Sequence, residues 1–198
     1  MLTQREIYRQ IFHLGVGIGT ALLFYFDILT AWIVFLMVMV GLLASILSKR
    51  TRLPFFSYFL DKFERDEQRR TFPGKGMIFF FIGVLLVMKL FEKDIALAAV
   101  MVLSLGDSVS HVFGAKFGQI KNIFNGKSRK LLEGTIAGAL AGGIGAVLFV
   151  PFPEAFLGSL GAMIAEVIKI DFNENTLDDN LVVPLIAGTV MLLAGKFV

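Results

Sequence analysis

Cysteine is absent from this 198-residue chain, and charged residues are scarce. The lack of cysteine excludes disulfides, thiol nucleophiles and the zinc sites that depend on thiolate ligands. Charged residues make up 18% of the chain, against about 25% in soluble domains. Apolar residues are abundant instead: the hydrophobic fraction is 56% and mean hydropathy is +0.77. This composition predicts an integral membrane protein.

Apolar runs predict an all-α, polytopic helical bundle of about seven transmembrane helices. The chain length fits one domain, 1–198, without internal division. The runs lie at about 11–26, 28–47, 75–91, 95–113, 134–151, 154–170 and 181–197.

Basic residues are concentrated in every second polar segment. They are Arg5 and Arg9; then Lys49, Arg50, Arg52, Lys62, Arg65, Arg69, Arg70 and Lys75; then Lys116, Lys121, Lys127, Arg129 and Lys130. Cytoplasmic loops of membrane proteins are enriched in Lys and Arg. Seven spans with a cytoplasmic N-terminus place all three segments in the cytoplasm, which predicts a multi-pass protein of the cell membrane.

An amphipathic pattern follows the second apolar run. In 53–63, the apolar residues Phe55, Phe56, Phe59, Leu60 and Phe63 share one helical face. Two interpretations stay open at this point: an interfacial helix on the inner leaflet, or a loop helix packed on the protein.

Small residues in the fifth run form a GxxxG motif, Gly138 to Gly142. This spacing lets helix backbones approach closely. Packing within the chain is the preferred interpretation, and a homodimer interface is the alternative.

Ionisable residues interrupt the fourth run at Asp107 and His111. With a rise of about 1.5 Å per residue, Asp107 lies roughly 18 Å along this segment, past a bilayer midplane. A carboxylate at that depth costs several kcal/mol without partners, which makes it a candidate functional residue. The two residues are four apart and share one helix face. The alternative to a functional role is a structural one, in which they form a hydrogen-bonded pair between helices.

Further ionisable residues fall on the same predicted side of the membrane. They are Arg9, His13, Lys127, Arg129, Lys130, Glu133, Glu166, Asp178 and Asp179, and the amide side chain of Asn180 follows directly. Carboxylates with an amide suit Mg²⁺, and Lys and Arg clusters suit phosphate chains. Together they indicate metal-assisted phosphoryl or nucleotidyl transfer at the membrane surface. Each also has a structural alternative: Asp178 to Asn180, for example, could cap the last helix.

Other chemistries fit less well. Asn125 to Ser128 resembles the end of a Walker A loop, but the first glycine of that motif is replaced by Lys121. Ser108 and Ser110 lie beside His111 without an oxyanion motif. The membrane topology explains the basic residues, so no nucleic-acid partner is expected.

At these residues the chain resembles the polytopic CTP-dependent lipid kinases, which include dolichol (polyprenol) kinases, phytol kinases and CTP-dependent diacylglycerol kinases. Phosphatidate cytidylyltransferases are more distant relatives of that family. The resemblance covers most of the chain, in order: Arg9-Gln-Ile-Phe-His13, Gly106-Asp-Ser-Val-Ser110 with Gly114 and Gly118, Gly126-Lys-Ser-Arg-Lys130, Glu133-Gly-Thr-Ile-Ala-Gly138, Glu166, and Asp178-Asp-Asn-Leu-Val-Val-Pro184. No Asp-Arg-x-Asp ending of the cytidylyltransferases is present.

The resemblance implies transfer of the CTP γ-phosphoryl group to a membrane lipid alcohol at the cytoplasmic face, with Mg²⁺. Asp107 and Asp179 would hold the metal, assisted by Asp178 or Glu166. The triphosphate would be bound by Lys127, Ser128, Arg129 and Lys130, with Asn180 orienting a phosphate or a metal-bound water. Glu133, Glu166 or His111 would take the hydroxyl proton, and the sequence does not choose among them.

Two other functions are weighed against this one. A cytidylyltransferase would use the same residues but release pyrophosphate and form a CDP-lipid. An ion-coupled transporter would use Asp107 and Glu166 as a cation path, but it predicts charges distributed through the membrane.

Overall fold

The computed structural model describes residues 3–51, 53–64, 71–122, 130–168, 171–172 and 175–197, and it is helical apart from one small hairpin. The helices are α1 (Gln4–Tyr25), α2 (Ala31–Ser48), α3 (Pro54–Phe63), α5 (Lys75–Leu90), α6 (Lys93–Met101), α7 (Asp107–Phe117), α8 (Leu132–Ala146), α9 (Phe152–Ile168) and α10 (Asp179–Ala194). Strands β1 (Asp171–Phe172) and β2 (Asn175–Thr176) pair antiparallel between α9 and α10. Each of the seven predicted apolar runs overlaps one of these helical segments for most of its length, and the run at 95–113 lies wholly inside one.

A π-helical turn, η1 (Val102–Gly106), joins α6 to α7 and makes one long helix of the two. Ala96 to Leu103 are all buried, so this long helix is the core of the bundle. The π turn ends directly before Asp107. Such turns widen the helix locally and are frequent at functional sites.

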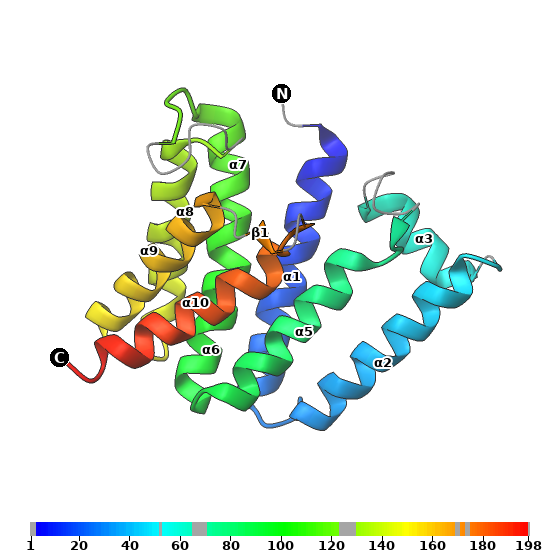
Figure 1. The fold of residues 1–198 in the computed structure, drawn as a ribbon, viewed down its shortest axis with the longest axis horizontal. Coiled ribbons are helices and arrows are strands. Elements are labelled where there is room, and N and C mark those ends of the chain that lie inside the picture. Colours follow the sequence, from blue (N-terminus) through cyan, green and yellow to red (C-terminus); the bar gives the residue numbers. More distant parts are fainter. Residues whose placement is uncertain are drawn as a thin grey trace.

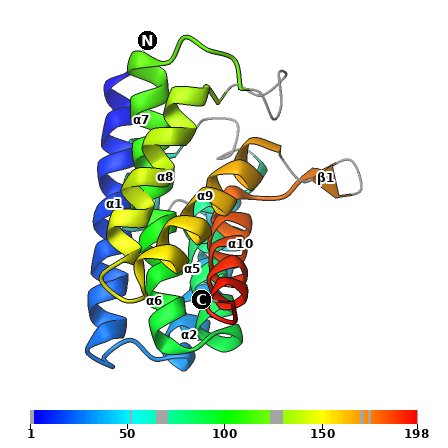
Figure 2. The same ribbon diagram turned by 90° about the vertical axis from the view of Figure 1, so that its left-hand side faces the viewer.

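The other helices surround this core (Figure 1). α8 packs between α7 and α9, while α10 packs against α9, α5 and α6. α2 lies on the side of the molecule away from α8 and α9, and it packs against α5. The N-terminal end of α1 and the C-terminal end of α7 lie at the same end of the bundle in both views (Figure 2).

Among the described residues, three helical segments are long and apolar enough to cross a membrane, by length and composition. They are Gln4–Tyr25, Ala31–Ser48 and Lys93–Phe117; α10 is apolar but shorter. On α2, large apolar side chains face outward, including Trp32 at 74% exposed and Val40 at 64%. Exposed apolar faces of this extent indicate a membrane protein.

The GxxxG glycines are buried in contacts within the chain. A Cβ on Gly138 would meet the carbonyl oxygen of Gly106 at 2.7 Å, and one on Gly142 would meet Oγ of Ser159 at 2.5 Å. These glycines therefore let α8 approach both the π turn and α9 closely, as the preferred interpretation of the motif predicted.

Candidate functional site

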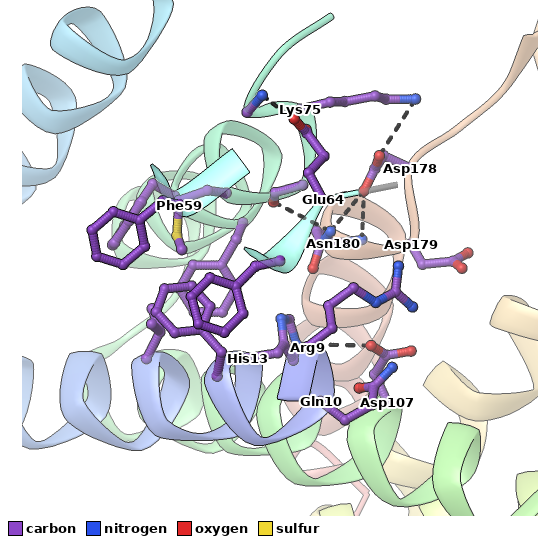
Figure 3. A pocket seen from close by; sticks show the side chains of 18 of the residues that line it. Arg9, Gln10, His13, Phe59, Glu64, Lys75, Asp107, Asp178, Asp179 and Asn180 are labelled. Atoms are coloured by element: carbon purple, nitrogen blue, oxygen red, sulfur yellow. Dashed lines mark hydrogen bonds and ion pairs between the residues drawn. The ribbon is translucent and has the colours of Figure 1, made fainter. Parts of the chain in front are cut away.

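A cavity of about 620 Å³ lies between α1, α3, α5, α7 and the start of α10. Its walls differ in character. One wall is polar and includes Arg9, Gln10, His13, Lys75, Asp107, His111, Lys130, Asp178, Asp179 and Asn180; the other is apolar and includes Phe12, Phe56, Phe59, Leu60, Phe63, Met77, Phe80 and Phe81. Figure 3 shows Phe59 on one side and the three aspartates on the other.

Lys130 is the centre of the polar wall. Its Nζ lies 3.7 Å from Oδ1 of Asp107 and 3.4 Å from Oδ2 of Asp179, and it forms a contact ion pair with Oε1 of Glu166. The three carboxylates come from α7, α10 and α9. Residues far apart in the sequence therefore converge on one cationic group, as the sequence predicted for a phosphate site.

Asp107 also faces α1. Its Oδ2 lies 3.8 Å from Nε2 of His13 (Figure 3). The His13 ring packs against the Phe80 ring edge to face, with 5.4 Å between the centroids. The predicted partner of Asp107 on its own helix, His111, instead contacts α1 at Glu6: Nε2 of His111 lies 2.9 Å from Oε1 of Glu6.

The Glu6 carboxylate gathers further groups on α1. Oε1 accepts hydrogen bonds from Nη2 of Arg9 at 2.5 Å and from Nε2 of Gln10 at 3.5 Å. Arg9, Gln10 and His111 all line the cavity. Glu6 therefore lies behind the lining: its Oε1 bonds Arg9 and Gln10, and Nε2 of His111 lies within ion-pair distance of it.

The start of α10 forms the third part of the polar wall. Asp178 caps this helix, because its Oδ1 accepts from the backbone N–H of Asn180 at 3.2 Å. The same oxygen accepts from Nδ2 of Asn180 at 2.9 Å, and Oδ2 lies 3.5 Å from Nζ of Lys75. Capping was the structural alternative for this segment, and Asp178 does cap the helix while it also lines the cavity.

Close packing of α5 against α10 fixes the position of the first residues of α10. A Cβ on Gly83 would meet the carbonyl oxygen of Asn180 at 2.2 Å. Nδ2 of Asn180 also donates to the carbonyl of Gly76 at 3.4 Å. Because backbone atoms cannot move aside as a flexible side chain can, glycine is required at 83 to set the position of Asn180.

The apolar wall depends on α3, which packs against α1. Phe12 stacks on Phe63 at 4.3 Å between ring centroids and lies 5.9 Å from Phe59. Nη2 of Arg5 donates to the carbonyl oxygens of Asp61 and Glu64 at the end of α3, at 3.2 and 2.6 Å. The amphipathic helix predicted at 53–63 is therefore present and packed on the protein.

The polar end of α3 is tied to α5 as well. Oε1 of Glu64, which is 8% exposed, accepts from the backbone N–H of Gly74 at 2.8 Å. Gly74 has φ 79°, a left-handed conformation that glycine adopts without strain. This bond sets the apolar wall against the start of α5, where Lys75 reaches the polar wall.

Glu133 does not line the cavity. Its Oε1 accepts from the backbone N–H groups of Gln119 and Ile120 at 2.9 and 3.0 Å. Hydrogen bonds from its own backbone and from Gln119 and Ile120 lower the pKa of this carboxyl below its usual value of 4.5. Glu133, in the first turn of α8, thus holds the two residues that follow the end of α7 at Gly118.

Part of the predicted phosphate site falls on residues that are not described. Lys127, Ser128 and Arg129 lie outside the described residues. Lys130 directly follows that segment and is the described member of the basic cluster.

The polar wall has the donor chemistry for a metal ion but not the arrangement. Asp107, Glu166 and Asp179 supply carboxylate oxygens, which Mg²⁺ prefers. They surround the Lys130 ammonium, and no group of three or more His, Asp or Glu side chains in the described ranges is arranged to hold a metal ion. As it stands, the site is built around a lysine.

Sequence reasoning missed Glu6, Gln10, Lys75 and Glu64. In the sequence analysis, Lys75 served only as one of the basic residues that predict which side of the membrane is cytoplasmic. The spacing of Glu6 and Arg9, three residues apart on one helix, predicts a local ion pair but gives no indication that His111 joins it.

Comparison with known proteins places the chain in a family. It is 31% identical over 192 residues to the uncharacterized protein MJ1137 of Methanocaldococcus jannaschii, covering 94% of this chain and 93% of that protein. The chain belongs to the same family as this archaeal protein.

A more distant match is to CTP-dependent diacylglycerol kinase 1 of Schizosaccharomyces pombe. The identity is 31% over 137 residues, which cover 60% of this chain and 59% of the kinase. This similarity supports a relationship with CTP-dependent lipid kinases. No family model and no solved structure matches the chain.

Proposed function

We propose that this protein is an integral membrane kinase that transfers the γ-phosphoryl group of CTP to the hydroxyl of a membrane lipid alcohol. One observation carries the proposal: a single cavity joins a wall of Lys, Arg and carboxylate side chains to a wall of aromatic rings. A phosphate chain suits the first wall, and a hydrocarbon chain suits the second. The distant similarity to a CTP-dependent diacylglycerol kinase supports the nucleotide and the lipid class.

The cationic side chains account for triphosphate binding. Lys130, Arg9 and Lys75 line the cavity and supply positive charge to the phosphates. In this proposal Lys127, Ser128 and Arg129 complete that set from the adjoining segment, and Asn180 orients a phosphate. Lys130 exchanges its carboxylate partners for phosphate oxygens when the nucleotide binds.

Mg²⁺ enters the proposal as the companion of CTP. Asp107 and Asp179 would hold it once Lys130 has turned to the phosphates, with Asp178 or Glu166 assisting. The ion, when bound, neutralises charge on the phosphate chain.

The transfer itself balances as follows. The lipid hydroxyl oxygen forms a bond to the γ-phosphorus, and the bond from that phosphorus to the bridging oxygen of CDP breaks. The electron pair leaves with CDP, and the hydroxyl proton passes to a side chain of the cavity. The products are a lipid monophosphate and CDP.

Membrane placement completes the proposal. All seven apolar helical segments span the bilayer, the N-terminus and the site face the cytoplasm, and residues 1–198 act as one catalytic domain. The hydroxyl of a polyprenol, a dolichol, phytol or a diacylglycerol would reach the polar wall from the inner leaflet. A homodimer stays a prediction.

The test is an assay of purified protein in nanodiscs with labelled nucleoside triphosphates and a panel of lipid alcohols and lipid phosphates. CDP and a lipid monophosphate are expected, and CTP should exceed ATP as donor. Asp107→Asn and Asp179→Asn should lower kcat at least about 100-fold if they act on the transferring group. Asp94→Asn, at the start of α6, serves as the control. Pyrophosphate with a CDP-lipid, or normal turnover of both site variants, contradicts the proposal.

A further inference from the structure

The Lys130 ammonium lies among three carboxylates that come from three different helices. Its Nζ is 3.7 Å from Oδ1 of Asp107 on α7 and 3.4 Å from Oδ2 of Asp179 on α10. It also forms a contact ion pair with Oε1 of Glu166 on α9. Because three negative charges face one positive charge, these carboxylates still favour a cation of higher charge. A divalent ion is such a cation, and Mg²⁺ prefers oxygen ligands.

The backbone directly after Lys130 is held in place. The backbone N–H of Leu132 donates to the carbonyl oxygen of Ile120 at 3.0 Å, and Leu131 forms an isolated β-bridge with Lys121. The Lys130 side chain has a flexible four-carbon stem, lines the cavity and is 14% exposed. Its ammonium can therefore turn towards a ligand in the cavity without movement of α8.

The three carboxylates differ in how they can be reached. Glu166 is 1% exposed and does not line the cavity, whereas Asp107 and Asp179 line it and Asp179 is 39% exposed. A metal ion that enters from the cavity would meet Asp107 and Asp179 first. Mg²⁺ is usually bound by one or two carboxylates together with substrate phosphates. These side chains thus supply one part of a magnesium site, and a phosphate chain would supply another.

We propose that the Lys130 ammonium is an intramolecular competitor of the divalent ion, which keeps the metal out until a phosphate chain draws the ammonium away. This inference rests on the proposed function for the identity of the nucleotide, and it adds the regulation of that site. A tethered ammonium has a high effective concentration, and Mg²⁺ gives up its water ligands reluctantly. The nucleotide-free protein therefore binds Mg²⁺ weakly.

Charge compensation explains why each ligand alone is disfavoured. A metal ion that displaced the ammonium would leave it beside a second cation without an anionic partner. A phosphate chain that drew the ammonium away would leave the buried Glu166 carboxylate uncompensated, which is costly. When both ligands bind, the ammonium faces phosphate and the metal faces the carboxylates. Nucleotide and metal should therefore raise each other's affinity for the protein.

The other cationic side chains of the cavity are placed differently. Nζ of Lys75 lies 3.5 Å from Oδ2 of Asp178, at the start of α10. Nε2 of His13 lies 3.8 Å from Asp107, but at the other carboxylate oxygen, Oδ2. Lys130 is the described cation that contacts all three carboxylates. This difference makes Lys75 a matched control, with the same charge in the same cavity.

Metal binding can be measured without nucleotide and without turnover. Mn²⁺, which suits the same ligands as Mg²⁺, is titrated into protein in nanodiscs of zwitterionic lipid, and free Mn²⁺ is followed by electron paramagnetic resonance. Lys130→Gln should bind Mn²⁺ about 5–150-fold more tightly than wild type, the usual range of coupling between two ligands. Asp107→Asn in the Lys130→Gln background should remove this gain. Lys75→Gln should bind as weakly as wild type.

A second variant covers the case in which Lys130→Gln does not fold. Lys130→Gln combined with Glu166→Gln removes the buried uncompensated carboxylate, and it should still bind Mn²⁺ more tightly than wild type through Asp107 and Asp179. Lys130→Arg keeps the positive charge and should bind as weakly as wild type. Equal affinities of wild type and both variants that lack the charge overturn the proposal. Tight binding by nucleotide-free wild type that Asp107→Asn abolishes also overturns it.

Added CTP tests the coupling. CTP should raise the Mn²⁺ retained by wild-type nanodiscs, measured against CTP with empty nanodiscs, by a larger factor than for Lys130→Gln. Equal factors overturn the coupling. If wild type forms no lipid phosphate, the proposed function fails, and the nucleotide-free comparison alone decides whether Lys130 competes with the metal.

Discussion

Lys130 and Glu166 form an ion pair in which the carboxylate is 1% exposed. Glu166 belongs to α9, and Lys130 precedes α8 on the chain. The pair therefore ties Lys130 to α9, and the ammonium lies within 4 Å of carboxylate oxygens of Asp107 and Asp179. Lys130 therefore both forms the ion pair with α9 and compensates the negative charge of the carboxylates at the site.

Removing the lysine alone should be costly. Lys130→Gln leaves three carboxylates facing one another, and breaking a buried pair in this way costs about 3–5 kcal/mol. The thermal unfolding temperature in detergent should fall clearly, whereas Lys89→Gln, at an exposed position, should leave it unchanged. Glu166→Gln in the Lys130→Gln background should recover part of the loss. Equal unfolding temperatures for Lys130→Gln and wild type would contradict the ion pair.

The Glu133 carboxylate should make the backbone at Gln119 and Ile120 sensitive to acid. Its pKa is lowered in the folded protein, so its contribution to stability is present above about 4.5 and is lost as the pH falls through the lowered value. Hydrogen exchange at Gln119 and Ile120, corrected for intrinsic rates, should accelerate at acid pH. In Glu133→Gln, exchange should be faster at neutral pH and lose that pH dependence. Glu92→Gln, at the opposite end of the bundle, should behave as wild type.

Phe59 should contribute to binding of the lipid chain. Burying an aromatic side chain against hydrocarbon is worth about 1.5–3 kcal/mol, so Phe59→Ala should raise KM for a long-chain lipid alcohol by about tenfold or more. KM for a short-chain alcohol and for CTP should not change. Trp32→Ala, a 74% exposed aromatic on α2, is the matched control. An equal effect on short and long chains would place the hydrocarbon elsewhere.

Gly83 should tolerate no side chain. Gly83→Ala places a methyl group 2.2 Å from the carbonyl oxygen of Asn180, so α5 and α10 must separate. We expect a lower unfolding temperature and loss of activity together, because Asp178 and Asp179 move with that helix start. Gly15→Ala, with nothing within 4 Å of the added Cβ, should be neutral or stabilising. Normal activity of Gly83→Ala would show that the helix start need not be fixed.

The helical segments were predictable because apolar runs are a local signal. All seven runs overlap a helix for most of their length, although the run at 134–151 continues five residues beyond α8, and the amphipathic pattern at 53–63 corresponds to α3. The two-residue strands β1 and β2 were not foreseen, because so short a hairpin leaves no periodicity to read. The number of helices that cross the membrane is a separate matter: length and composition support three of those described.

The gathering of Asp107, Lys130, Glu166 and Asp179 was also foreseen, since buried charges need partners. The individual pairings were not. Glu166 pairs with Lys130, and His111 pairs with Glu6 rather than with Asp107. Helical spacing shows which residues share a face but not which neighbouring helix covers it, and here α1 supplies the partner.

The π turn at Val102–Gly106 sets the direction in which the long central helix presents Asp107 and His111. Deleting one residue there would rotate everything that follows by about 100° about the helix axis. Asp107 and His111 would swing away from α1 together, yet the apolar length of the segment would hardly change. The apolar length of this helix and the orientation of Asp107 and His111 are thus separable properties of one element.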